Sequence, residues 1–273
     1  MTVEKTQNKK EQERPREFAP IMEVKNLTKS FQVGDQEISV LKGIDLQIGV
    51  NDFVIIFGPS GCGKSTLLYS ILGLEVPTSG SVSILGEDLY ANKDEDDRTE
   101  FRKRHIGMVY QQSNWVNSLT VVENVALPLI LSGKSRVESL KAAWEMLAIS
   151  HMSNWADYKP AELSSGQQQK VAVARALITN PEIIIADEPT GNLDFESGQS
   201  FIYLLADLNH VGKTVVMVTH DLEYLRQAKT AVRMLDGKIV EIYDGKKEGA
   251  IDDKDFKYKK KVSNVEEVYA NRK

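Results

Sequence analysis

The sequence contains one cysteine, Cys62, and no apolar run long enough to cross a membrane. A single cysteine excludes a disulfide within the chain and is typical of a reducing compartment. A membrane-spanning helix needs about 20 apolar residues, whereas the best run, at 125–131, is much shorter and contains Pro128. The N-terminal twenty residues are polar throughout and lack the apolar segment of a secretory signal. Any membrane role is therefore expected to act through a partner chain.

The sequence also lacks an excess of basic residues. Its 34 Lys and Arg are outnumbered by 39 Asp and Glu, which gives a formal net charge of −5. Nucleic-acid-binding domains usually carry a basic face, so we expect no nucleic-acid partner. Hydrophobic residues make up 41% and charged residues 27% of the 273 residues, a balance typical of a globular protein with a sizeable core.

Two charged segments flank a structured middle. Residues 1–20 are predicted to form a disordered N-terminal tail, and residues 245–273 a charged C-terminal extension. A solvated extension is favoured there, but Phe256, Tyr258 and the lysines at 259–261 leave a contact with lipid open. The biased run KDEDDR at 93–98 is interpreted as a surface loop.

Between these ends, short apolar runs alternate with helical patterns. The runs at 53–57, 183–186 and 215–218 have the continuous apolar character of buried parallel strands. Helical patterns lie close to each of them, at 64–74, 165–179 and 197–209. This alternation predicts an α/β domain in which helices pack on the faces of a mainly parallel sheet.

Two segments depart from the alternation. Residues 22–27 and 38–48 alternate between apolar and polar side chains and lack helices, which predicts an N-terminal antiparallel β portion. A mostly helical block at about 119–155 interrupts the β/α order. We interpret it as a helical subdomain, spanning about 112–165, inserted into a domain that covers 21–244.

The strongest motif is GPSGCGKST at 58–66, which matches the phosphate-loop pattern of glycine, four residues, Gly-Lys and then Ser or Thr. Its glycines allow successive backbone N–H groups to turn inward around phosphate oxygens. The following helix points its partially positive N-terminus at the same phosphates. Lys64 supplies a full positive charge, and the Ser65 hydroxyl is placed to bind Mg²⁺. The residues expected to hold the nucleotide are Gly58, Pro59, Ser60, Gly61, Cys62, Gly63, Lys64, Ser65 and Thr66.

Polar residues follow two other predicted strands. Asp187 and Glu188 end the run at 183–186, and His220 follows the run at 215–218. The carboxyl ends of parallel strands form the crevice in which α/β sheets bind ligands. Asp187 is therefore expected to hold Mg²⁺, Glu188 to orient and deprotonate the attacking water, and His220 to contact the γ-phosphate.

Four further segments carry a resemblance to a known family. LSSGQQQKVAVARAL at 163–177 resembles the signature motif of ATP-binding cassette (ABC) ATPases, and ADEPTGNLD at 186–194 resembles their Walker B and D-loop. Gln111 in GMVYQQ resembles the Q-loop glutamine, and VTHD contains His220. The resemblance extends over about four fifths of the chain. It implies a P-loop NTPase fold and an ATPase subunit of a transporter.

The resemblance also implies a composite site in a head-to-tail homodimer that encloses two ATP molecules. Lys64, Glu188, His220 and Gln111 would be catalytic, and Ser65, Gln111 and Asp187 would hold Mg²⁺. Phe31 would lie against the adenine. The second copy would present Ser164, Gly166 and Gln167 to the γ-phosphate, and Asp194 would connect the two sites. Trp115 and Val116, just after Gln111, are candidates for docking a membrane permease, although core packing explains them equally well.

Three positions depart from the family pattern. Ser165 replaces the first glycine that usually follows the signature serine, Phe31 replaces the usual tyrosine and Lys170 replaces a common arginine. Serine is small, so we expect activity to survive. A phenylalanine ring can still stack on a base, whereas a lysine cannot make the bidentate contacts of arginine.

The wording of the motifs resembles a branch that serves lipoprotein release, macrolide export, antimicrobial-peptide resistance and cell-division signalling. Its permeases often have few membrane spans and a large extracytoplasmic domain, and some complexes transmit force across the bilayer. This implies a location on the cytoplasmic side of the cell membrane, held there by the permease. An importer-type ABC ATPase and a soluble, non-transport ABC ATPase remain alternatives.

Overall fold

The computed structural model describes residues 19–112 and 114–245. Nearly all of the two predicted charged ends, 1–20 and 245–273, therefore lies outside the described residues. Within the described part, no helix combines the length and the apolar character needed to cross a bilayer.

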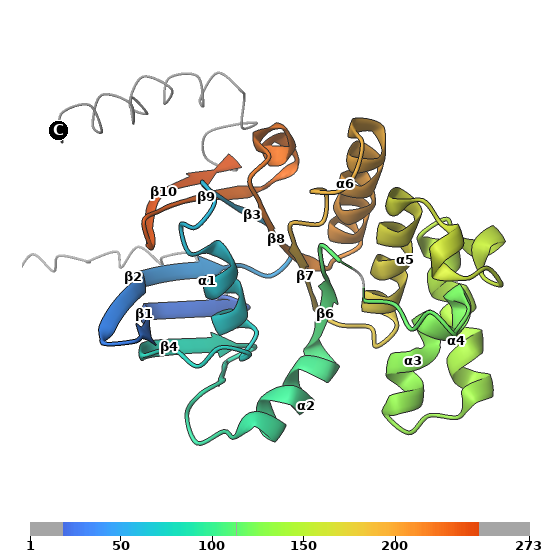
Figure 1. The fold of residues 1–273 in the computed structure, drawn as a ribbon, viewed down its shortest axis with the longest axis horizontal. Coiled ribbons are helices and arrows are strands. Elements are labelled where there is room, and N and C mark those ends of the chain that lie inside the picture. The colour runs from blue at the N-terminus through green and yellow to red at the C-terminus, as the bar shows by residue number, and fades with distance from the viewer. Residues whose placement is uncertain (1–18, 113, 246–273) are drawn as a thin grey trace, which may run out of the picture.

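Two sheets form one half of the molecule (Figure 1). The first is antiparallel, with the order β2-β1-β4-β5. Its strands are β1 (Met22–Val33), β2 (Gln36–Ile48), β4 (Ser79–Ile84) and β5 (Glu87–Asp88). Alternate side chains of β1 and β2 are buried near the start of β1 and the end of β2, as expected for strands with one face on a core.

The second sheet has six strands in the order β10-β9-β3-β8-β7-β6. Its members are β3 (Phe53–Phe57), β6 (Ile106–Val109), β7 (Ile183–Asp187), β8 (Thr214–Thr219), β9 (Thr230–Leu235) and β10 (Lys238–Asp244). All pairs are parallel except β9 with β10. Every residue of β3, β7 and β8 is buried, which explains their continuous apolar sequences.

Three helices accompany the sheets. α1 (Lys64–Ile71) follows β3, α2 (Glu95–His105) leads into β6, and α6 (Phe195–His210) precedes β8. One apolar core joins the antiparallel sheet, α1 and one face of the six-stranded sheet. A second core joins the other face of that sheet to α6. The sheet is therefore covered on both faces.

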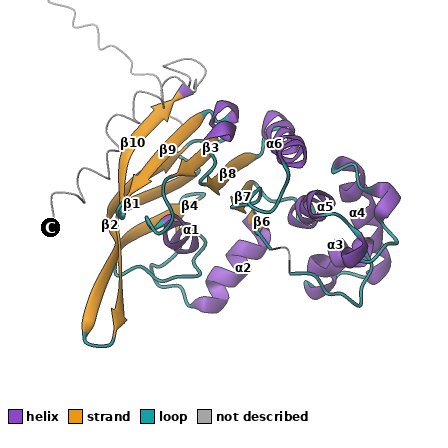
Figure 2. Ribbon diagram, turned by 45° about the horizontal axis from the view of Figure 1, so that its top comes forward, coloured by secondary structure: helices purple, strands orange, loops and turns teal. Residues whose placement is uncertain are grey.

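A helical region extends away from the sheets (Figures 1 and 2). It contains α3 (Val121–Leu131), α4 (Arg136–Ile149), two short 3₁₀ turns and α5 (Ser165–Leu177), which returns the chain to β7. A third apolar core joins α3 and α4 to one side of α5. The other side of α5 contributes Val173 and Leu177 to the core beside the sheet. α5 therefore connects the helical region with the sheet.

The prediction of a surface loop at 93–98 is wrong from residue 95 onward, because those residues form a helix. α2 begins at Glu95, with Asp94 as its N-cap and Asp97 completing a capping box. Carboxylates accept from the free N–H groups of a first helical turn and favour its partial positive charge. The acidic run therefore starts a helix, and Arg98 within it is buried.

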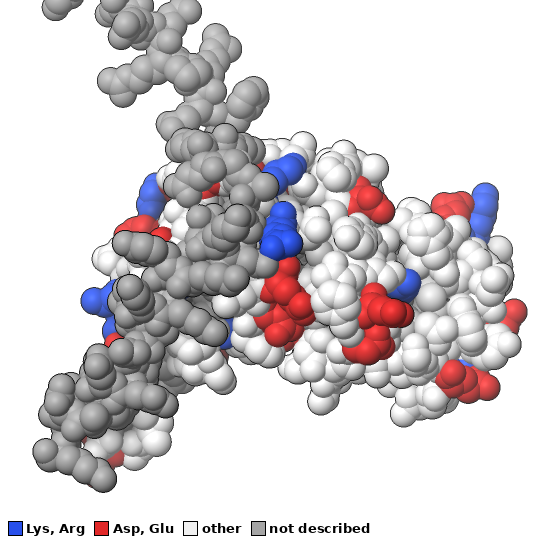
Figure 3. Space-filling model, turned by 90° about the horizontal axis from the view of Figure 1, so that it is seen from above, with Lys and Arg blue, Asp and Glu red and all other residues white. Residues whose placement is uncertain are grey.

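On the face in Figure 3, acidic and basic side chains are scattered among uncharged ones.

Candidate functional site

The phosphate loop joins β3 to α1 and requires glycine at defined positions. Gly58 has φ of 157° and Gly63 has φ of 101°, values that side-chain-bearing residues rarely adopt. A Cβ on Gly58 would also lie 2.2 Å from the carbonyl oxygen of Met234 in β9. The loop can therefore adopt its turn only with glycine at these points.

Lys64 begins α1 and lies inside the loop. It is 5% exposed, and its Nζ donates to the carbonyl oxygens of Gly58 at 2.9 Å and Pro59 at 3.0 Å. Nζ also lies 4.0 Å from Oε1 of Glu188. Ser65, the next residue, is exposed at the start of the helix. This arrangement places a buried cation and an exposed hydroxyl on adjacent residues at a helix N-terminus.

Glu188 lies between Lys64 and His220. Its Oε2 is 2.9 Å from Nδ1 of His220, which follows β8, and its backbone N–H donates to Val218. The φ of Glu188 is 43°, a left-handed conformation that is costly for a residue other than glycine. A strained acid in contact with a cation and an imidazole is typical of a functional position.

Asp187 ends β7 and is 9% exposed. Tyr69 of α1 donates its hydroxyl to Oδ2 of Asp187 at 3.3 Å, whereas the buried Oδ1 has no hydrogen-bond partner. Burial raises the pKa of Asp187 above its usual value. A buried carboxylate oxygen without a donor fits a cation ligand, because Mg²⁺ prefers oxygen ligands. Asp187 and Ser65 therefore have the chemistry of a Mg²⁺ site.

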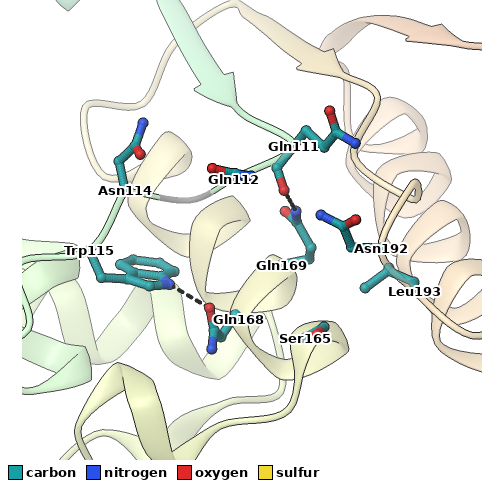
Figure 4. Close-up of a pocket in the computed structure, with 9 residues that line it drawn as sticks. All are labelled: Gln111, Gln112, Asn114, Trp115, Ser165, Gln168, Gln169, Asn192 and Leu193. Carbon is teal, nitrogen blue, oxygen red and sulfur yellow. Dashed lines mark hydrogen bonds between the residues drawn. The ribbon is translucent and has the colours of Figure 1, made fainter.

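Gln111 follows β6 at an amide-rich hollow (Figure 4). Gln169 of α5 donates from Nε2 to the backbone carbonyls of Tyr110 at 3.1 Å and Gln111 at 2.9 Å. A Cβ on Gly191 would lie 2.9 Å from Nε2 of Gln111, so the Gln111 side chain passes close to the turn after Glu188. The segment is thus fixed to α5 at its backbone and reaches toward the acidic turn with its side chain.

The signature residues lie at the start of α5. Ser164 is the N-cap and forms a capping box with Gln167. A Cβ on Gly166 would lie 2.8 Å from Cβ and Oγ of Ser197 in α6, and Asp194, the N-cap of α6, accepts hydrogen bonds from Ser197. Ser164, Gly166 and Asp194 are thus close together, while α5 and α1 lie apart in both ribbon views (Figures 1 and 2).

Three other predicted residues lie outside this group. Phe31 on β1 is 36% exposed, with Nζ of Lys29 at 4.8 Å from its ring centre. Trp115 packs against the two cores beside α5, and its Nε1 donates to Gln168 at 2.9 Å. Val116 is 40% exposed. Core packing therefore explains the position of Trp115, whereas the side chain of Val116 is exposed and available to a partner.

A larger groove separates the sheet domain from the helical region. Its volume is about 590 Å³, and its walls come from α2 and β6 on one side and from α3 and α5 on the other. Met108, Leu127, Pro128 and Leu131 supply apolar lining, and Lys103 and Arg175 contribute positive charge.

Tyr69 and Gln169 are functional candidates that the sequence analysis did not identify. Tyr69 contacts the acid 118 residues later in the chain, and Gln169 contacts carbonyls 58 and 59 residues earlier. In the sequence, the one feature that could have identified them is their position on a helix: Tyr69 lies one turn after Ser65, and Gln169 lies one turn after Gly166.

Comparison with known proteins agrees with these motifs. The ABC transporter family model matches residues 41–191. An uncharacterized ABC transporter ATP-binding protein, MJ1508, from Methanocaldococcus jannaschii is 42% identical over 222 residues, covering 81% of this chain and 99% of its own. The macrolide export ATP-binding/permease protein MacB of Shigella flexneri is 41% identical over 224 residues. That match covers 82% of this chain but 34% of MacB, so the chain spans about a third of the MacB length.

The solved structures give the same result. The ATP-binding cassette MJ0796, in a dimeric post-hydrolysis state bound to ADP and Pi, is 42% identical with a TM-score of 0.75, covering 82% of this chain and 98% of that one. The mainly parallel sheet, the antiparallel N-terminal portion and the helical insertion predicted from the sequence are confirmed. The protein belongs to the ABC transporter family, as an ATP-binding cassette.

Proposed function

We propose that the chain hydrolyses Mg²⁺-bound ATP in a head-to-tail homodimer and thereby drives a membrane permease. The observation that carries this proposal is the position of Glu188, whose carboxylate lies 4.0 Å from Nζ of Lys64 and 2.9 Å from Nδ1 of His220. A carboxylate, a cation and an imidazole meet beside a phosphate loop, where phosphoryl transfer to water needs groups that position the water and stabilise the developing charge.

The residues divide the reaction between them. The loop N–H groups, the N-terminus of α1 and Lys64 bind the phosphates. Glu188 orients the attacking water and accepts its proton, and His220 holds that carboxylate and contacts the γ-phosphate. Asp187, Ser65 and Gln111 would hold Mg²⁺. When bound, Mg²⁺ would neutralise the charge that develops on the phosphate oxygens.

The dimer completes the site. Ser164 and Gly166 lie on α5, apart from the phosphate loop of their own chain, so they are free to meet the γ-phosphate held by a second copy. The N-terminus of α5 would stabilise the added charge in trans. Asp194 packs beside Gly166 through Ser197 and would link the two sites, and Phe31 would stack on the adenine. The dimeric state of MJ0796 supports this assembly.

The groove between the sheet domain and the helical region would receive the permease on the cytoplasmic side of the membrane. Closure on ATP and opening after hydrolysis would change the distance between the two grooves of a dimer and move the permease. The relatedness to MacB supports an export, lipoprotein-release or force-transmission role. An importer-type ABC ATPase would use the same catalytic residues, and its permease distinguishes it.

The Glu188→Gln variant tests the catalytic assignment. It keeps the size of the side chain but removes the base, so we expect ATP turnover to fall by at least about 100-fold, the lower range for proton-transfer catalysis. Binding of Mg²⁺-ATP should be retained. Unchanged turnover with retained binding would show that Glu188 is not the base. Static light scattering should also detect an ATP-dependent dimer of this variant.

The transport role is tested separately, by identifying the membrane protein that co-purifies with the tagged chain. A permease with few spans and a large extracytoplasmic domain would support the export or force-transmission branch. An importer-type permease would contradict that branch and leave the ATPase assignment intact.

A further inference from the structure

Tyr69 lies on the same face of α1 as the proposed metal ligand Ser65. The two residues are four positions apart, which places them one above the other on a helix. Both are exposed, whereas Lys64, Leu67 and Leu68 are buried. The face that carries the Ser65 hydroxyl therefore also carries the phenol of Tyr69.

The phenol contacts one oxygen of Asp187 and leaves the other without a hydrogen-bond donor. Tyr69 Oη donates to Oδ2 at 3.3 Å, and Oδ1 is buried and has no hydrogen-bond partner. A carboxylate held at one oxygen cannot rotate freely about its Cβ–Cγ bond. The free oxygen is then presented in one direction, and outer partners of this kind orient the groups that bind a metal.

We propose that Tyr69 is a positioning residue that holds Oδ2 of Asp187 so that Oδ1 faces the Mg²⁺ bound with ATP. This inference rests on the proposed function, because it requires Asp187 to bind the metal. Tyr69 belongs to none of the three apolar cores and is 36% exposed. Its hydroxyl is therefore explained by the contact with Asp187 and not by packing.

The test measures how much Mg²⁺ strengthens nucleotide binding. The Kd of a non-hydrolysable ATP analogue is measured by calorimetry with EDTA and with excess Mg²⁺. The Kd with EDTA divided by the Kd with Mg²⁺, here called the Mg²⁺ ratio, reports the coupling between metal and nucleotide. In Tyr69→Phe we expect the Kd with EDTA to be unchanged and the Kd with Mg²⁺ to rise about tenfold. Loss of such partners costs about 10–100-fold, and the long 3.3 Å contact favours the lower end.

Tyr90→Phe is the matched control. The Tyr90 hydroxyl also contacts α1 and the segment after it, donating to the carbonyl oxygens of Ser70 and Glu75, whereas no hydrogen bond joins it to Asp187. We expect this variant to lower the melting temperature while the Mg²⁺ ratio stays that of the wild type. A lowered ratio in Tyr90→Phe, equal to that in Tyr69→Phe, would show a general effect of α1 stability and overturn the inference.

Asp187→Asn separates failure of this inference from failure of the proposed function. We expect it to lower the Mg²⁺ ratio, and adding Tyr69→Phe should then have no further effect. If Asp187→Asn lowers the ratio but Tyr69→Phe alone does not, Tyr69 has no positioning role. If Asp187→Asn leaves the ratio unchanged, Asp187 does not bind the metal and that part of the proposed function is wrong.

Discussion

At the scale of single residues, the hydrogen bond between His220 and Glu188 leads to a direct prediction. His220→Ala removes the group proposed to hold the base and to contact the γ-phosphate, so kcat should fall about 100-fold. ATP binding, which depends mainly on the phosphate loop, should change much less. Steady-state ATPase kinetics and nucleotide titration measure the two effects.

His210→Ala is the matched control, because His210 is exposed at the last turn of α6. Its kcat should equal that of the wild type. An equal loss of kcat in both histidine variants would contradict a specific role for His220.

Gly198 in α6 gives a prediction about stability. Ala usually stabilises a helix interior relative to Gly by about 0.5–1 kcal/mol. Here a Cβ would lie 2.3 Å from Oη of the buried Tyr224, so Gly198→Ala should lower the free energy of unfolding by about 1–3 kcal/mol. Urea denaturation measures the change. Adding Tyr224→Phe should recover part of the loss, whereas a stabilised Gly198→Ala variant would contradict the close contact.

The sequence predicted catalytic residues where a strand end or a glycine loop marked them. Lys64, Glu188 and His220 follow buried strands of one parallel sheet, so they had to meet at one edge. Tyr69 carries no such mark, because a tyrosine within a helix is typical of ordinary packing. Its relation to Asp187 depends on how α1 lies on the sheet, which is a tertiary property.

At the scale of elements, helix starts are defined by capping side chains. Thr120 and Glu123 form a capping box at the start of α3. Thr120→Ala should lower the free energy of unfolding by about 1 kcal/mol, the usual cost of losing a cap. Urea denaturation at neutral pH measures it. Ser132→Ala, at the other end of α3, should lower the free energy of unfolding by less. The Ser132 hydroxyl donates to a single carbonyl oxygen in the last turn of α3.

The same box predicts a pH dependence. The backbone N–H of Thr120 lowers the pKa of Glu123, so the folded protein favours the charged carboxylate. The resulting stability is present above the unfolded pKa of Glu, about 4.3, and is lost as the pH falls through the lower folded pKa. The stability difference between wild type and Glu123→Gln should therefore shrink below about pH 4.3. A difference that is constant from pH 7 to pH 3 would contradict this.

Capping also explains the one element that the sequence analysis misassigned. The run at 93–98 is polar, and polarity alone indicates a loop. Asp94 with Asp97 three residues later is also a helix-start pattern, and Arg102 and Arg104 favour the end of the same helix. The correct interpretation required the charge order along the segment and not its average polarity.

At the scale of the whole molecule, the proposed composite site predicts complementation between two inactive chains. Lys64→Ala removes the phosphate-binding cation. Ser165→Glu places a negative charge where the γ-phosphate of the second copy would lie, yet an acid suits a helix N-terminus and should leave the fold intact. Each variant alone should be inactive. In an equal mixture, half of the dimers contain one intact site of two, so activity should recover to about a quarter of the wild type.

Two results would contradict the trans assignment. The first is full activity of Ser165→Glu alone, since its charge would then not meet the nucleotide. The second is no recovery in a mixture that forms dimers. A mixture of Lys64→Ala with Glu188→Gln is the control, because both defects lie in the phosphate-loop half. Its heterodimers contain no intact site, so activity should not recover.

The sequence predicted the layers of the molecule but not the strand order. Continuous apolar runs identified β3, β7 and β8, and alternation identified the antiparallel front. The order β10-β9-β3-β8-β7-β6 depends on pairings between segments far apart in the chain, which local patterns do not encode. The placement of α5 between two cores likewise depends on tertiary contacts on both of its sides.

The central place of β3 has a consequence for how the protein is made. Phe53 pairs with Val215 of β8, and Val54 pairs with Thr230 of β9. Both sheet neighbours of β3 are thus synthesised more than 150 residues after it, so β3 and the phosphate loop that follows it lack their parallel neighbours until most of the chain has left the ribosome. Contacts so distant in sequence form slowly. A nascent chain that stops before β8 therefore has neither neighbour of β3 and should be unable to retain nucleotide.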